Sequence, residues 1–425
     1  MAFNSLCVIG LGYIGLPTAC TFANHDVKVI GVDINQEIVS GLQNGKVHLF
    51  EPGLQEFVQH AIKTGNLVIR SHPEAADAFI IAVPTPFKEG NKADLDAVIS
   101  AAKSIVPHLR KDNLVILEST SPPRTTEDIV APILEKSGLK AGIDFQLAYS
   151  PERVLPGQIL KELVENARII GGIDPTSAQA GRELYEIFVK GEIFLTDATT
   201  AEMVKLMENT YRDINIAAAN EFSRLADRFQ VDIWEAIALA NRHPRVKVLN
   251  PGPGVGGHCI SVDPWFLVEA APDLAHLIRS AREVNDNQPA YIVDFIQRKM
   301  GNLTGKRISA LGLAYKADVD DLRESPAIEV VHLLDEAGAI MTVFEPYKTS
   351  FALEGMHASL NLKECLVDTD ALLLLVSHQQ FKGMVPDEIA RITKARIAID
   401  TVHGWERSNW EKAGFNFLRP GDGKN

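Results

Sequence analysis

A glycine-rich turn near the start of the chain constrains the fold more strongly than any other segment. It reads Gly10-Leu11-Gly12-Tyr13-Ile14-Gly15, with an apolar run at 6–9 before it and a helical pattern at 16–24 after it. A second apolar run, at 27–32, ends in Asp33, 23 positions after Gly10. Strand, turn, helix and strand in this order, with an acidic residue at the end, predict a Rossmann-type dinucleotide-binding domain.

The residues of this turn also predict the cofactor. Gly10 permits the tight turn, Gly12 lets the backbone approach a pyrophosphate, and Gly15 allows close helix–strand packing. The start of the helix points its positive end at the phosphates. The expected cofactor contacts in the turn are Gly10, Gly12, Tyr13, Ile14 and Gly15. Asp33 can accept hydrogen bonds from ribose hydroxyls and would repel a 2′-phosphate, which favours NAD over NADP. A purely structural glycine turn is the alternative.

The composition limits the class of protein. A length of 425 residues predicts two or three domains, and the 46% hydrophobic and 23% charged residues are ordinary for a globular chain. A formal net charge of −13 argues against a nucleic-acid-binding surface, which needs a basic patch. Cys7, Cys20, Cys259 and Cys365 are scattered, without a CxxC pair or zinc spacing, so we expect no disulfide framework and no metal.

No targeting or membrane segment is visible in the sequence. The chain enters the apolar run at 6–9 without a basic stretch before it. Apolar runs such as 371–376 are far shorter than the ~20 residues of a membrane span. We therefore expect a cytoplasmic protein with no membrane partner.

Two further apolar runs end in hydroxyl residues. The run at 77–83 is followed by Pro84-Thr85-Pro86, and the run at 114–117 by Glu118-Ser119-Thr120. Because ligands bind outside the carboxyl ends of parallel strands, Thr85 and Thr120 are candidate cofactor contacts. Both could instead be turn or cap residues.

A nearly glycine-free region from Thr200 to about Ala240 interrupts the alternation of strands and helices and predicts helix. Lys205, Asn209 and Arg212 follow one another at i, i+4 and i+7 and share one face of such a helix. Lys205 and Asn209 suggest a functional polar face. A solvated amphipathic helix is the alternative, because exposed Lys and Arg are common.

A loop at 251–264 presents the candidate nucleophile. Four glycines and two prolines stand in the eight residues before Cys259. Such a segment forms neither an ordinary helix nor a central strand, and it lets backbone approach a ligand closely. In a chain that opens with a dinucleotide motif, Cys259 is therefore a candidate nucleophile of a redox enzyme. A small buried cysteine in a tight loop is the alternative.

The C-terminal third repeats the pattern of the N-terminal one. Residues 307–316 are typical of a strand and turn with fewer glycines, 369–376 echo 76–83, and 396–401 echo 114–119. These echoes predict an α/β fold with two related halves joined by the helical region. The expected domains are an N-terminal Rossmann dinucleotide-binding domain at 1–197, a central helical domain at 198–300 and a C-terminal Rossmann-like α/β domain at 301–425.

Taken together, these motifs resemble those of the nucleotide-sugar 6-dehydrogenases, a family that includes UDP-glucose dehydrogenase. The resemblance spans nearly the whole chain. Its motifs are Gly10–Gly15 with Asp33, Ser150-Pro151-Glu152-Arg153, Lys205 with Asn209, Gly256-Gly257-His258-Cys259 to Asp263, and Gly312 through Lys316 to Asp321-Leu322-Arg323-Glu324-Ser325-Pro326. The loops at 150–157 and 254–267 are most similar to those of enzymes that oxidise UDP-N-acetyl-D-mannosamine. Oxidation of UDP-N-acetylglucosamine or UDP-glucose is the alternative.

The resemblance implies that a sugar alcohol is oxidised at C6 to a carboxylate, with two NAD⁺ consumed. Lys205 would polarise the alkoxide, while Asp263 and a water take the proton. Cys259 would attack the aldehyde, and the thiohemiacetal would be oxidised to a thioester that water hydrolyses. Asn209 and Glu152 complete the implied catalytic set. The uronate product would serve surface-polysaccharide synthesis.

One position departs from the family pattern. UDP-glucose dehydrogenases carry a second carboxylate four residues after the glutamate that matches Glu152, and this chain has Pro156 there. A deacylation role for that second acid cannot be carried over. Glu152 or Asp263 acting through water, or another group, remains open. Arg153 also replaces the usual aromatic residue of the substrate loop.

The resemblance further implies a UDP-sugar site in which basic residues meet two phosphates, and it makes the third domain a UDP-binding domain. The matching positions are Arg153, Val154, Lys205, Asn209, Arg212, His243, Arg245, Gly256, Tyr315, Lys316 and Arg407. Arg323 matches an arginine that reaches the cofactor. His243 and Arg245 resemble a segment that comes from a neighbouring subunit, so we expect a homodimer, formed through the central helices, or a higher homo-oligomer.

Two other classes of protein fit less well. A nucleotide-sugar-binding protein without activity has no reason to keep Lys205, Asn209, Cys259 and Asp263 together. A 3-hydroxyacid-type dehydrogenase would share the first two domains, but the third α/β domain and the Cys259 loop would be unexplained.

Overall fold

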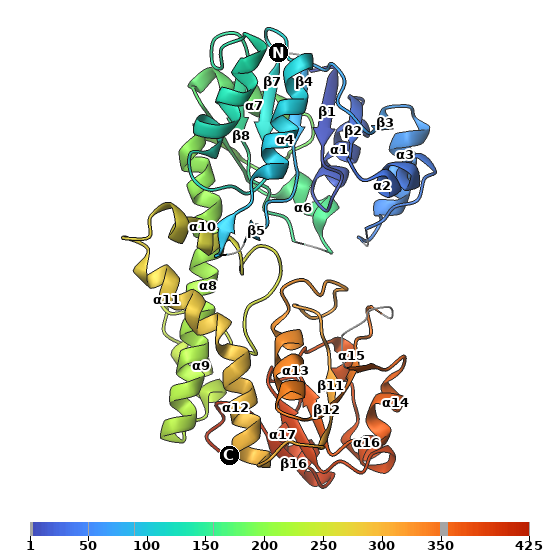
Figure 1. The fold of residues 1–425 in the computed structure, drawn as a ribbon, viewed down its shortest axis with the longest axis vertical. Helices are drawn as coiled ribbons and strands as arrows, with labels where there is room; N and C mark the ends of the chain where they lie inside the picture. The colour runs from blue at the N-terminus through green and yellow to red at the C-terminus, as the bar shows by residue number, and fades with distance from the viewer. Residues whose placement is uncertain (1–2, 50, 89, 156, 349–355, 425) are drawn as a thin grey trace. The chain divides into compact units, whose positions relative to one another are not determined.

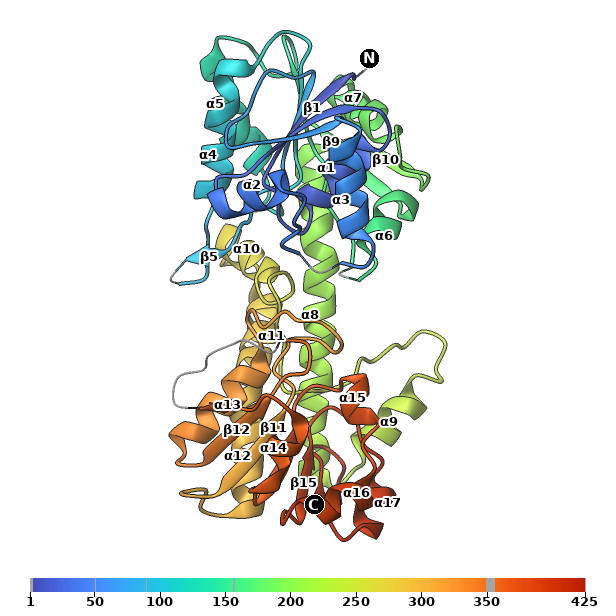
Figure 2. The same cartoon turned by 90° about the vertical axis from the view of Figure 1, so that its right-hand side faces the viewer.

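The computed structural model describes residues 3–49, 51–88, 90–155, 157–348 and 356–424 (Figures 1 and 2). The chain folds into two compact units, and each contains its own sheet. The first unit comprises residues 1–208 and 265–272, and the second comprises residues 209–264 and 273–425.

The described residues of the first unit form an eight-stranded sheet in the order β10-β9-β8-β7-β4-β1-β2-β3. Its strands are β1 (Ser5–Ile9), β2 (Lys28–Val32), β3 (Leu67–Arg70), β4 (Ala78–Ile81), β7 (Leu114–Leu117), β8 (Gln146–Tyr149), β9 (Arg168–Gly172) and β10 (Ile193–Asp197). Neighbouring strands are parallel except β8 and β9, which run antiparallel. A short hairpin of β5 (Phe87–Lys88) and β6 (Lys92–Ala93) follows β4.

Both faces of this sheet are buried, because alternate residues of its apolar strands point to opposite sides. Leu6 and Val8 of β1 pack into one cluster with α1, α2, α3, α6 and α7, whereas Cys7 and Ile9 pack into another with α4 and α5. Figure 2 shows α4 and α5 on one side of the sheet and α1, α3 and α6 on the other. The helices are α1 (Gly15–Ala23), α2 (Gln36–Gln43), α3 (Leu54–Lys63), α4 (Asp96–Ile105), α5 (Ala131–Leu134), α6 (Ile159–Glu165) and α7 (Pro175–Tyr185).

The helical region expected from Thr200 to about Ala240 consists of two helices, α8 (Ala198–Phe229) and α9 (Ile233–Ala240). The chain breaks at Gln230, whose φ of 57° is left-handed, and Asp232 then caps α9 by accepting hydrogen bonds from the N–H groups of Trp234 and Glu235. The loop that contains Cys259 follows. It leads into α10 (Asp263–Ala270), α11 (His276–Asp286) and α12 (Gln288–Met300).

Helix α8 buries charged side chains and exposes apolar ones. Glu202, Lys205 and Asp213 are buried, whereas Met203 and Met207 are 38% and 54% exposed. Met203 and Met207 therefore lie on the outer face of this helix. Its inner face carries polar as well as apolar side chains, and buried partners satisfy the polar groups; the carboxylate of Glu202, for example, accepts hydrogen bonds from Thr126.

The second unit contains a parallel sheet whose described strands lie in the order β13-β12-β11-β14-β15-β16. They are β11 (Arg307–Leu311), β12 (Ile340–Phe344), β13 (His357–Ala358), β14 (Ala371–Leu374), β15 (Ile397–Asp400) and β16 (Asn416–Leu418). The accompanying helices are α13 (Pro326–Glu336), α14 (Leu362–Val367), α15 (Gln379–Lys382), α16 (Pro386–Ile392) and α17 (Arg407–Lys412). In this sheet β14 pairs with β11 and β15 with β14, just as β4 pairs with β1 and β7 with β4 in the first sheet, so the predicted repetition is confirmed.

The described ranges contain no helix that is both long enough and apolar enough to cross a membrane. They also contain no group of three or more His, Cys, Asp or Glu side chains arranged to hold a metal ion.

Candidate active site

The turn after β1 is shaped to receive a phosphate-bearing ligand. Gly10 has a φ of 94°, and a Cβ on it would lie 2.5 Å from the carbonyl oxygen of Ala82. A Cβ on Gly15, the first residue of α1, would lie 1.8 Å from the carbonyl oxygen of Gly10. A Cβ on Gly12 would meet nothing within 4 Å, so this backbone faces open space. Ile14 occupies the N-cap of α1, and its side chain caps no backbone N–H group. An anion beside Gly12 would therefore meet the positive end of α1.

Asp33, at the end of β2, is held in an orientation suited to a ribose. Its Oδ2 accepts a hydrogen bond from the N–H of Leu11 at 3.0 Å, and its Oδ1 accepts one from the N–H of Asn35 at 2.8 Å. Burial lowers the pKa of the neighbouring His48, an effect that the Asp33 carboxylate opposes. Tyr13 is half-buried against the core beneath the turn. The geometry therefore fits NAD, with the glycine turn for the pyrophosphate and Asp33 for the ribose hydroxyls.

Thr85 and Thr120 follow neighbouring strands, β4 and β7, and contact each other. The Thr85 hydroxyl donates a hydrogen bond to the Thr120 carbonyl oxygen at 2.6 Å. This bond gives Thr85 a local structural role. Its hydroxyl oxygen keeps the capacity to accept, so a contact with the cofactor stays a prediction.

The predicted substrate loop is bound tightly to its own unit. Glu152 accepts hydrogen bonds from the N–H of Arg153 at 2.7 Å and from Nη2 of Arg168 at 2.5 Å. The Arg153 guanidinium pairs with Glu208 at 2.7 Å and also bonds the Ala167 carbonyl oxygen. Val154 packs against the core of the first unit. Pro156 of this loop lies outside the described residues.

Lys205 is buried on α8, with 9% of its surface exposed.

Two buried residues beside this loop were missing from the sequence-based prediction. Arg168 bonds both Glu152 and Glu118, a carboxylate that directly follows β7. A sequence signal existed for each: Arg168 opens the apolar run at 168–172, and Glu118 closes the apolar run at 114–117. A charged side chain at the end of a buried strand needs a buried partner of opposite charge, and this requirement could have identified Arg168 and Glu118 as a pair.

The second unit contains the candidate nucleophile and its neighbours. Cys259 is half-exposed in a tight turn, where its carbonyl oxygen accepts hydrogen bonds from the N–H groups of Val262 and Asp263 at 3.0 and 2.8 Å. Nδ2 of Asn209 donates to Oδ2 of Asp263 at 2.5 Å. The turn thus fixes the thiol's backbone, and the amide of Asn209 orients the carboxylate four residues further on.

The glycines before Cys259 pack against the loop that follows β11. The N–H of Gly257 donates to the carbonyl oxygen of Arg323 at 3.1 Å. A Cβ on Gly257 would lie 2.8 Å from Cε2 of Tyr315, and one on Gly256 would lie 2.4 Å from the carbonyl oxygen of Glu324. Only glycine allows these approaches, so Gly256, Tyr315 and Arg323 are brought together by the packing.

Asp321 links this loop to both a histidine and an arginine. Nε and Nη2 of Arg323 donate to its carboxylate at 2.9 and 2.6 Å, and Nδ1 of His258 lies 3.8 Å from it. Burial acts to raise the pKa of Asp321, but the hydrogen bonds from Arg323 outweigh burial and hold this pKa below its usual value. In this structure the guanidinium of Arg323 therefore pairs with Asp321, and its predicted contact with the cofactor stays a prediction.

A buried amide network anchors the start of the loop at 251–264, which contains the candidate nucleophile. The N–H of Gly252 donates to Oδ1 of Asn220 at 2.9 Å, and its carbonyl oxygen accepts from Nε2 of Gln288 at 3.1 Å. Nδ2 of Asn220 donates in turn to Oδ1 of Asn285 at 2.9 Å. Both ends of the loop are therefore fixed by side chains from helices of the second unit.

The remaining predicted residues of the second unit are Arg212, His243, Arg245, Lys316 and Arg407. Arg212, His243 and Arg245 are exposed, with Nδ1 of His243 accepting from the N–H of Arg245 at 3.3 Å. Lys316 is half-buried. Arg407 is committed to local structure, since its guanidinium bonds Glu411, Asp422 and the carbonyl oxygen of Phe417.

Comparison with protein families covers most of the chain. The NAD-binding domain of the UDP-glucose/GDP-mannose dehydrogenase family matches residues 4–189. The central domain of that family matches residues 199–287, and its UDP-binding domain matches residues 309–407.

Individual relatives agree with these matches. A UDP-N-acetyl-D-mannosamine dehydrogenase from Methanococcus maripaludis is 48% identical over 99% of this chain and 97% of its own. An NDP-N-acetyl-D-galactosaminuronic acid dehydrogenase from Ralstonia solanacearum is 48% identical over 95% of this chain and 96% of its own. The solved structure of a UDP-D-ManNAc dehydrogenase from Pyrococcus horikoshii is similar with a TM-score of 0.92 and 40% identity, and it covers 99% of this chain and 100% of its own.

Proposed function

Because the chain belongs to the UDP-glucose/GDP-mannose dehydrogenase family, we propose that it oxidises C6 of UDP-N-acetyl-D-mannosamine to a carboxylate. The protein is an NAD-dependent oxidoreductase, and NAD supplies the hydride-accepting chemistry when bound. One observation supports a four-electron oxidation most directly. Backbone hydrogen bonds hold Cys259 in a fixed turn, and Asn209 orients the carboxylate of Asp263 at the end of that turn. The product, UDP-N-acetyl-D-mannosaminuronate, would serve surface-polysaccharide synthesis.

In the first oxidation Lys205 and Asp263 have different roles. The ammonium of Lys205 stabilises the negative charge that develops on the 6-oxygen. Asp263, held by Asn209, orients a water that takes the hydroxyl proton. The C6 hydride leaves as the carbonyl forms, so the alcohol becomes an aldehyde that stays bound.

In the second oxidation Cys259 makes the aldehyde oxidisable. Its sulfur bonds to C6, and the carbonyl oxygen takes up a proton to give a thiohemiacetal. Loss of that proton and of the second hydride leaves a thioester. Water activated by Glu152 then adds to C6, and the C–S bond breaks to release the carboxylate. One alcohol, one water and two NAD⁺ give one carboxylate, two NADH and three protons.

The identity of the sugar rests on relatives and on the loops around the site. Relatives at 46–50% identity are named as dehydrogenases of UDP-N-acetyl-D-mannosamine, and the Ralstonia relatives at 47–48% carry a galactosaminuronic acid name. A galacto-configured amino sugar is therefore a second candidate substrate. UDP-N-acetylglucosamine and UDP-glucose remain the alternatives that the sequence left open.

The three family segments support the assignment of a different function to each of three domains. We assign cofactor binding to residues 1–197, dimerisation and catalysis to 198–300, and UDP-sugar binding to 301–425. The family's NAD-binding, central and UDP-binding domains match within or close to these ranges. Because the mechanism needs Cys259 as a thiol, a reducing compartment such as the cytoplasm suits it.

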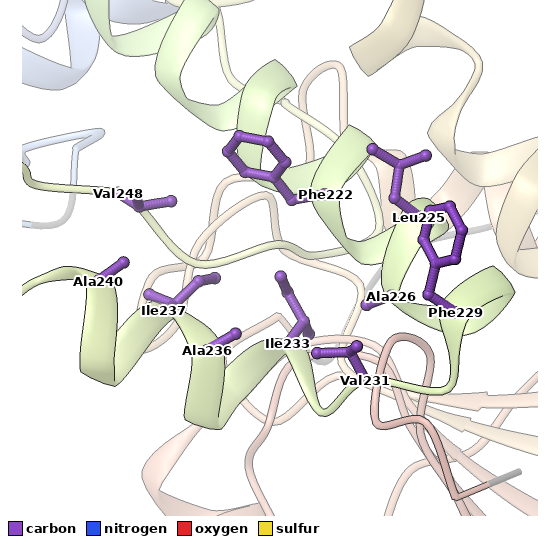
Figure 3. Close-up of a pocket in the computed structure, with 10 residues that line it drawn as sticks. All are labelled: Phe222, Leu225, Ala226, Phe229, Val231, Ile233, Ala236, Ile237, Ala240 and Val248. Carbon is purple, nitrogen blue, oxygen red and sulfur yellow. The ribbon is translucent and has the colours of Figure 1, made fainter.

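The outer face of α8 supports a homodimer. Phe222, Leu225 and Phe229 are 47%, 45% and 70% exposed, at the spacing of one helix face. They open into an apolar hollow of about 270 Å³ between α8, α9 and Val248 (Figure 3). An exposed apolar surface of this kind is typical of an interface, and a second copy of the chain is the occupant that we propose. The exposed His243 and Arg245 would then be available to the neighbouring subunit.

Initial-rate assays of NADH formation with four UDP-sugars test the proposal. They compare N-acetylmannosamine, N-acetylglucosamine, N-acetylgalactosamine and glucose as the sugar. An epimer that leaves one or two hydrogen bonds unpaired should lose roughly ten-fold or more in kcat/KM. We expect UDP-N-acetyl-D-mannosamine to lead by that margin, with two NADH formed per sugar. A clear preference for another epimer would overturn the substrate, and one NADH per sugar would overturn the mechanism.

A further inference from the structure

A cluster of charges is sealed inside the first unit, at the carboxyl ends of β7 and β8. The side chain of Arg168 is 5% exposed, that of Glu118 is fully buried and that of Glu152 is 8% exposed. Nη1 of Arg168 lies 3.3 Å from Oε1 of Glu118, and Nη2 lies 2.5 Å from Oε2 of Glu152. One guanidinium thus serves two carboxylates.

The reversed direction of β9 is what brings Arg168 to this place. Strands β8 and β9 pair antiparallel, with Tyr149 opposite Gly171. Continuing this register by three residues places Arg168 opposite Glu152. A β9 parallel to β8 would carry its first residue to the other end of the sheet, away from Glu152.

Further contacts fix the guanidinium in one orientation. It stacks over the ring of Tyr185, 4.1 Å from the centroid, and Nη1 also donates to the Ser150 hydroxyl at 3.1 Å. The Tyr185 hydroxyl donates in turn to Oε1 of Glu118. Arginine is suited to this arrangement because its planar fork can address two carboxylates and an aromatic face at once.

The cluster is costly as a purely structural element. Burying ion pairs is often no more stabilising than packing apolar side chains of similar volume. Oε2 of Glu118 has no hydrogen-bond partner among the described residues, which adds to the cost. A sealed charge cluster that touches a candidate catalytic carboxylate therefore calls for a functional account.

We propose that Arg168 is a positioning residue that fixes the orientation and charge of the Glu152 carboxylate, and that Glu118 competes with Glu152 for the same guanidinium. This inference rests on the proposed function, which gives Glu152 its acid–base role. When Glu118 is neutral, the whole positive charge of Arg168 serves Glu152. When Glu118 is ionised, the charge is shared, and Glu152 is bound less strongly.

The surroundings of Glu118 allow it to change its proton near neutral pH. Burial raises the pKa of Glu118 to about 7, an effect that Arg168 opposes and that the charge of Glu152 strengthens. The groups that face Glu118 are Arg168 from β9, Glu152 from the loop after β8 and Tyr185 from α7. Activity that depends on Glu152 should therefore carry an ionisation that belongs to Glu118.

The decisive variant is Glu118→Gln, which keeps the shape and the acceptor for Tyr185 but cannot ionise. The kcat/KM of the full-length wild type, measured from pH 5.5 to 9, should show an ionisation near pH 7, and Glu118→Gln should lack it. The matched control is Glu202→Gln. Glu202 is a buried carboxylate of the same unit whose pKa burial also raises to about 7, but it accepts hydrogen bonds from Thr126 and from the backbone N–H of Arg124 and does not contact Arg168. This control should keep the ionisation.

Substitutions at Arg168 complete the test. Arg168→Lys keeps the charge but loses the fork, and we expect kcat to fall at least about 10-fold with the KM for NAD changed by less than about three-fold. NAD binding by calorimetry reports whether the variant is folded. A Glu118→Gln profile identical to that of the wild type, or an Arg168→Lys variant with wild-type kcat, would overturn this inference. Wild-type activity in Glu152→Gln would instead overturn the catalytic role of Glu152 in the proposed function, so the two failures are distinguishable.

Discussion

Asp33 and Glu345 occupy equivalent positions in the two sheets, yet only Asp33 is open to a ligand. Each directly follows the second strand of its sheet and accepts a hydrogen bond from the residue after the first turn glycine. The N–H of Leu11 donates to Asp33 at 3.0 Å, and the N–H of Leu313 donates to Glu345 at 2.8 Å. Glu345 is 1% exposed.

A buried histidine pairs with Glu345 at the second of these positions. His378 is fully buried and lies with Nε2 3.1 Å from Oε2 of Glu345, while its Nδ1 accepts from the N–H of Asp318 at 2.8 Å. Because Nδ1 accepts, Nε2 carries the proton and donates to Glu345. The ribose-binding acid of a dinucleotide fold is thus replaced by an internal pair, which explains why the repeated fold does not imply a second NAD site.

Cofactor choice should depend on Asp33. The wild type should prefer NAD to NADP by at least about 100-fold in kcat/KM, because a 2′-phosphate would face this carboxylate. Asp33→Ala should reduce that preference about ten-fold or more. Glu37→Ala removes a nearby exposed charge that does not contact Leu11 and should leave the preference unchanged. Equal use of NADP by the wild type would contradict this role.

Loss of the thiol should stop the four-electron reaction. Cys259→Ser should lower steady-state turnover by at least about 10³-fold, because a hydroxyl is a much poorer nucleophile than a thiolate. Calorimetry should still detect NAD and UDP-sugar binding. Cys365→Ala, which removes a buried thiol from the second sheet's core, should still give two NADH per sugar. Turnover of Cys259→Ser near the wild-type rate would exclude a thioester.

The loop at 251–264 should tolerate a methyl group at one glycine and not at another. Gly257 has a φ of 83°, and its added Cβ would press on the Tyr315 ring at 2.8 Å, so Gly257→Ala should cost about 1–3 kcal/mol of stability or a comparable loss in kcat. Gly252→Ala is the matched control, since its Cβ meets nothing within 4 Å. Thermal melts and kcat measured on both variants check this. Equal effects of the two substitutions would show that the Tyr315 contact does not hold the loop.

Stability should fall with rising pH through the ionisation of Glu118. Its folded-state pKa, raised by burial to about 7, lies above the ordinary value of 4.5, so the folded state binds the proton more tightly. This contribution is complete below about pH 4.5 and is lost as pH rises through about 7. The Tm of the wild type should therefore drop more between pH 5 and 8 than that of Glu118→Gln. Parallel Tm curves for the two proteins would refute the assignment.

The oligomeric state should respond to the outer face of α8. Phe229→Glu should convert a dimer into a 46.5 kDa monomer in light scattering, because a charge would be buried in the proposed interface. Ile143→Glu places the same charge at an apolar residue that is 81% exposed elsewhere, and it should leave the mass unchanged. A monomeric wild type would exclude the proposed interface.

The parts of the fold that follow from local pattern were predictable. The Gly10–Gly15 turn with Asp33 predicted the first nucleotide fold, and the echoes at 369–376 and 396–401 predicted the second. These signals are local because turn geometry and strand burial are encoded in neighbouring residues.

The parts that depend on distant pairing were not predictable. Arg168 meets Glu118 and Glu152 only because β9 runs antiparallel to β8, and no local pattern records strand direction. The partners of Arg323 and Arg407 were missed for a similar reason, since a surface arginine and an arginine paired with Asp321 or Asp422 look alike in a sequence.

The usual rules for redesigning a protein's surface and core would be harmful if they were applied to α8. A redesign aimed at solubility would replace exposed Met207, Tyr211 and Phe229 with polar residues, and a redesign aimed at a stronger core would replace buried Glu202 and Asp213 with leucine. The first would remove part of the apolar surface that we propose as a dimer interface, and the second would remove hydrogen-bond acceptors from Thr126 and Arg282. Sequence drift in this helix should therefore keep carboxylates at Glu202 and Asp213 and apolar side chains at Met207, Tyr211 and Phe229.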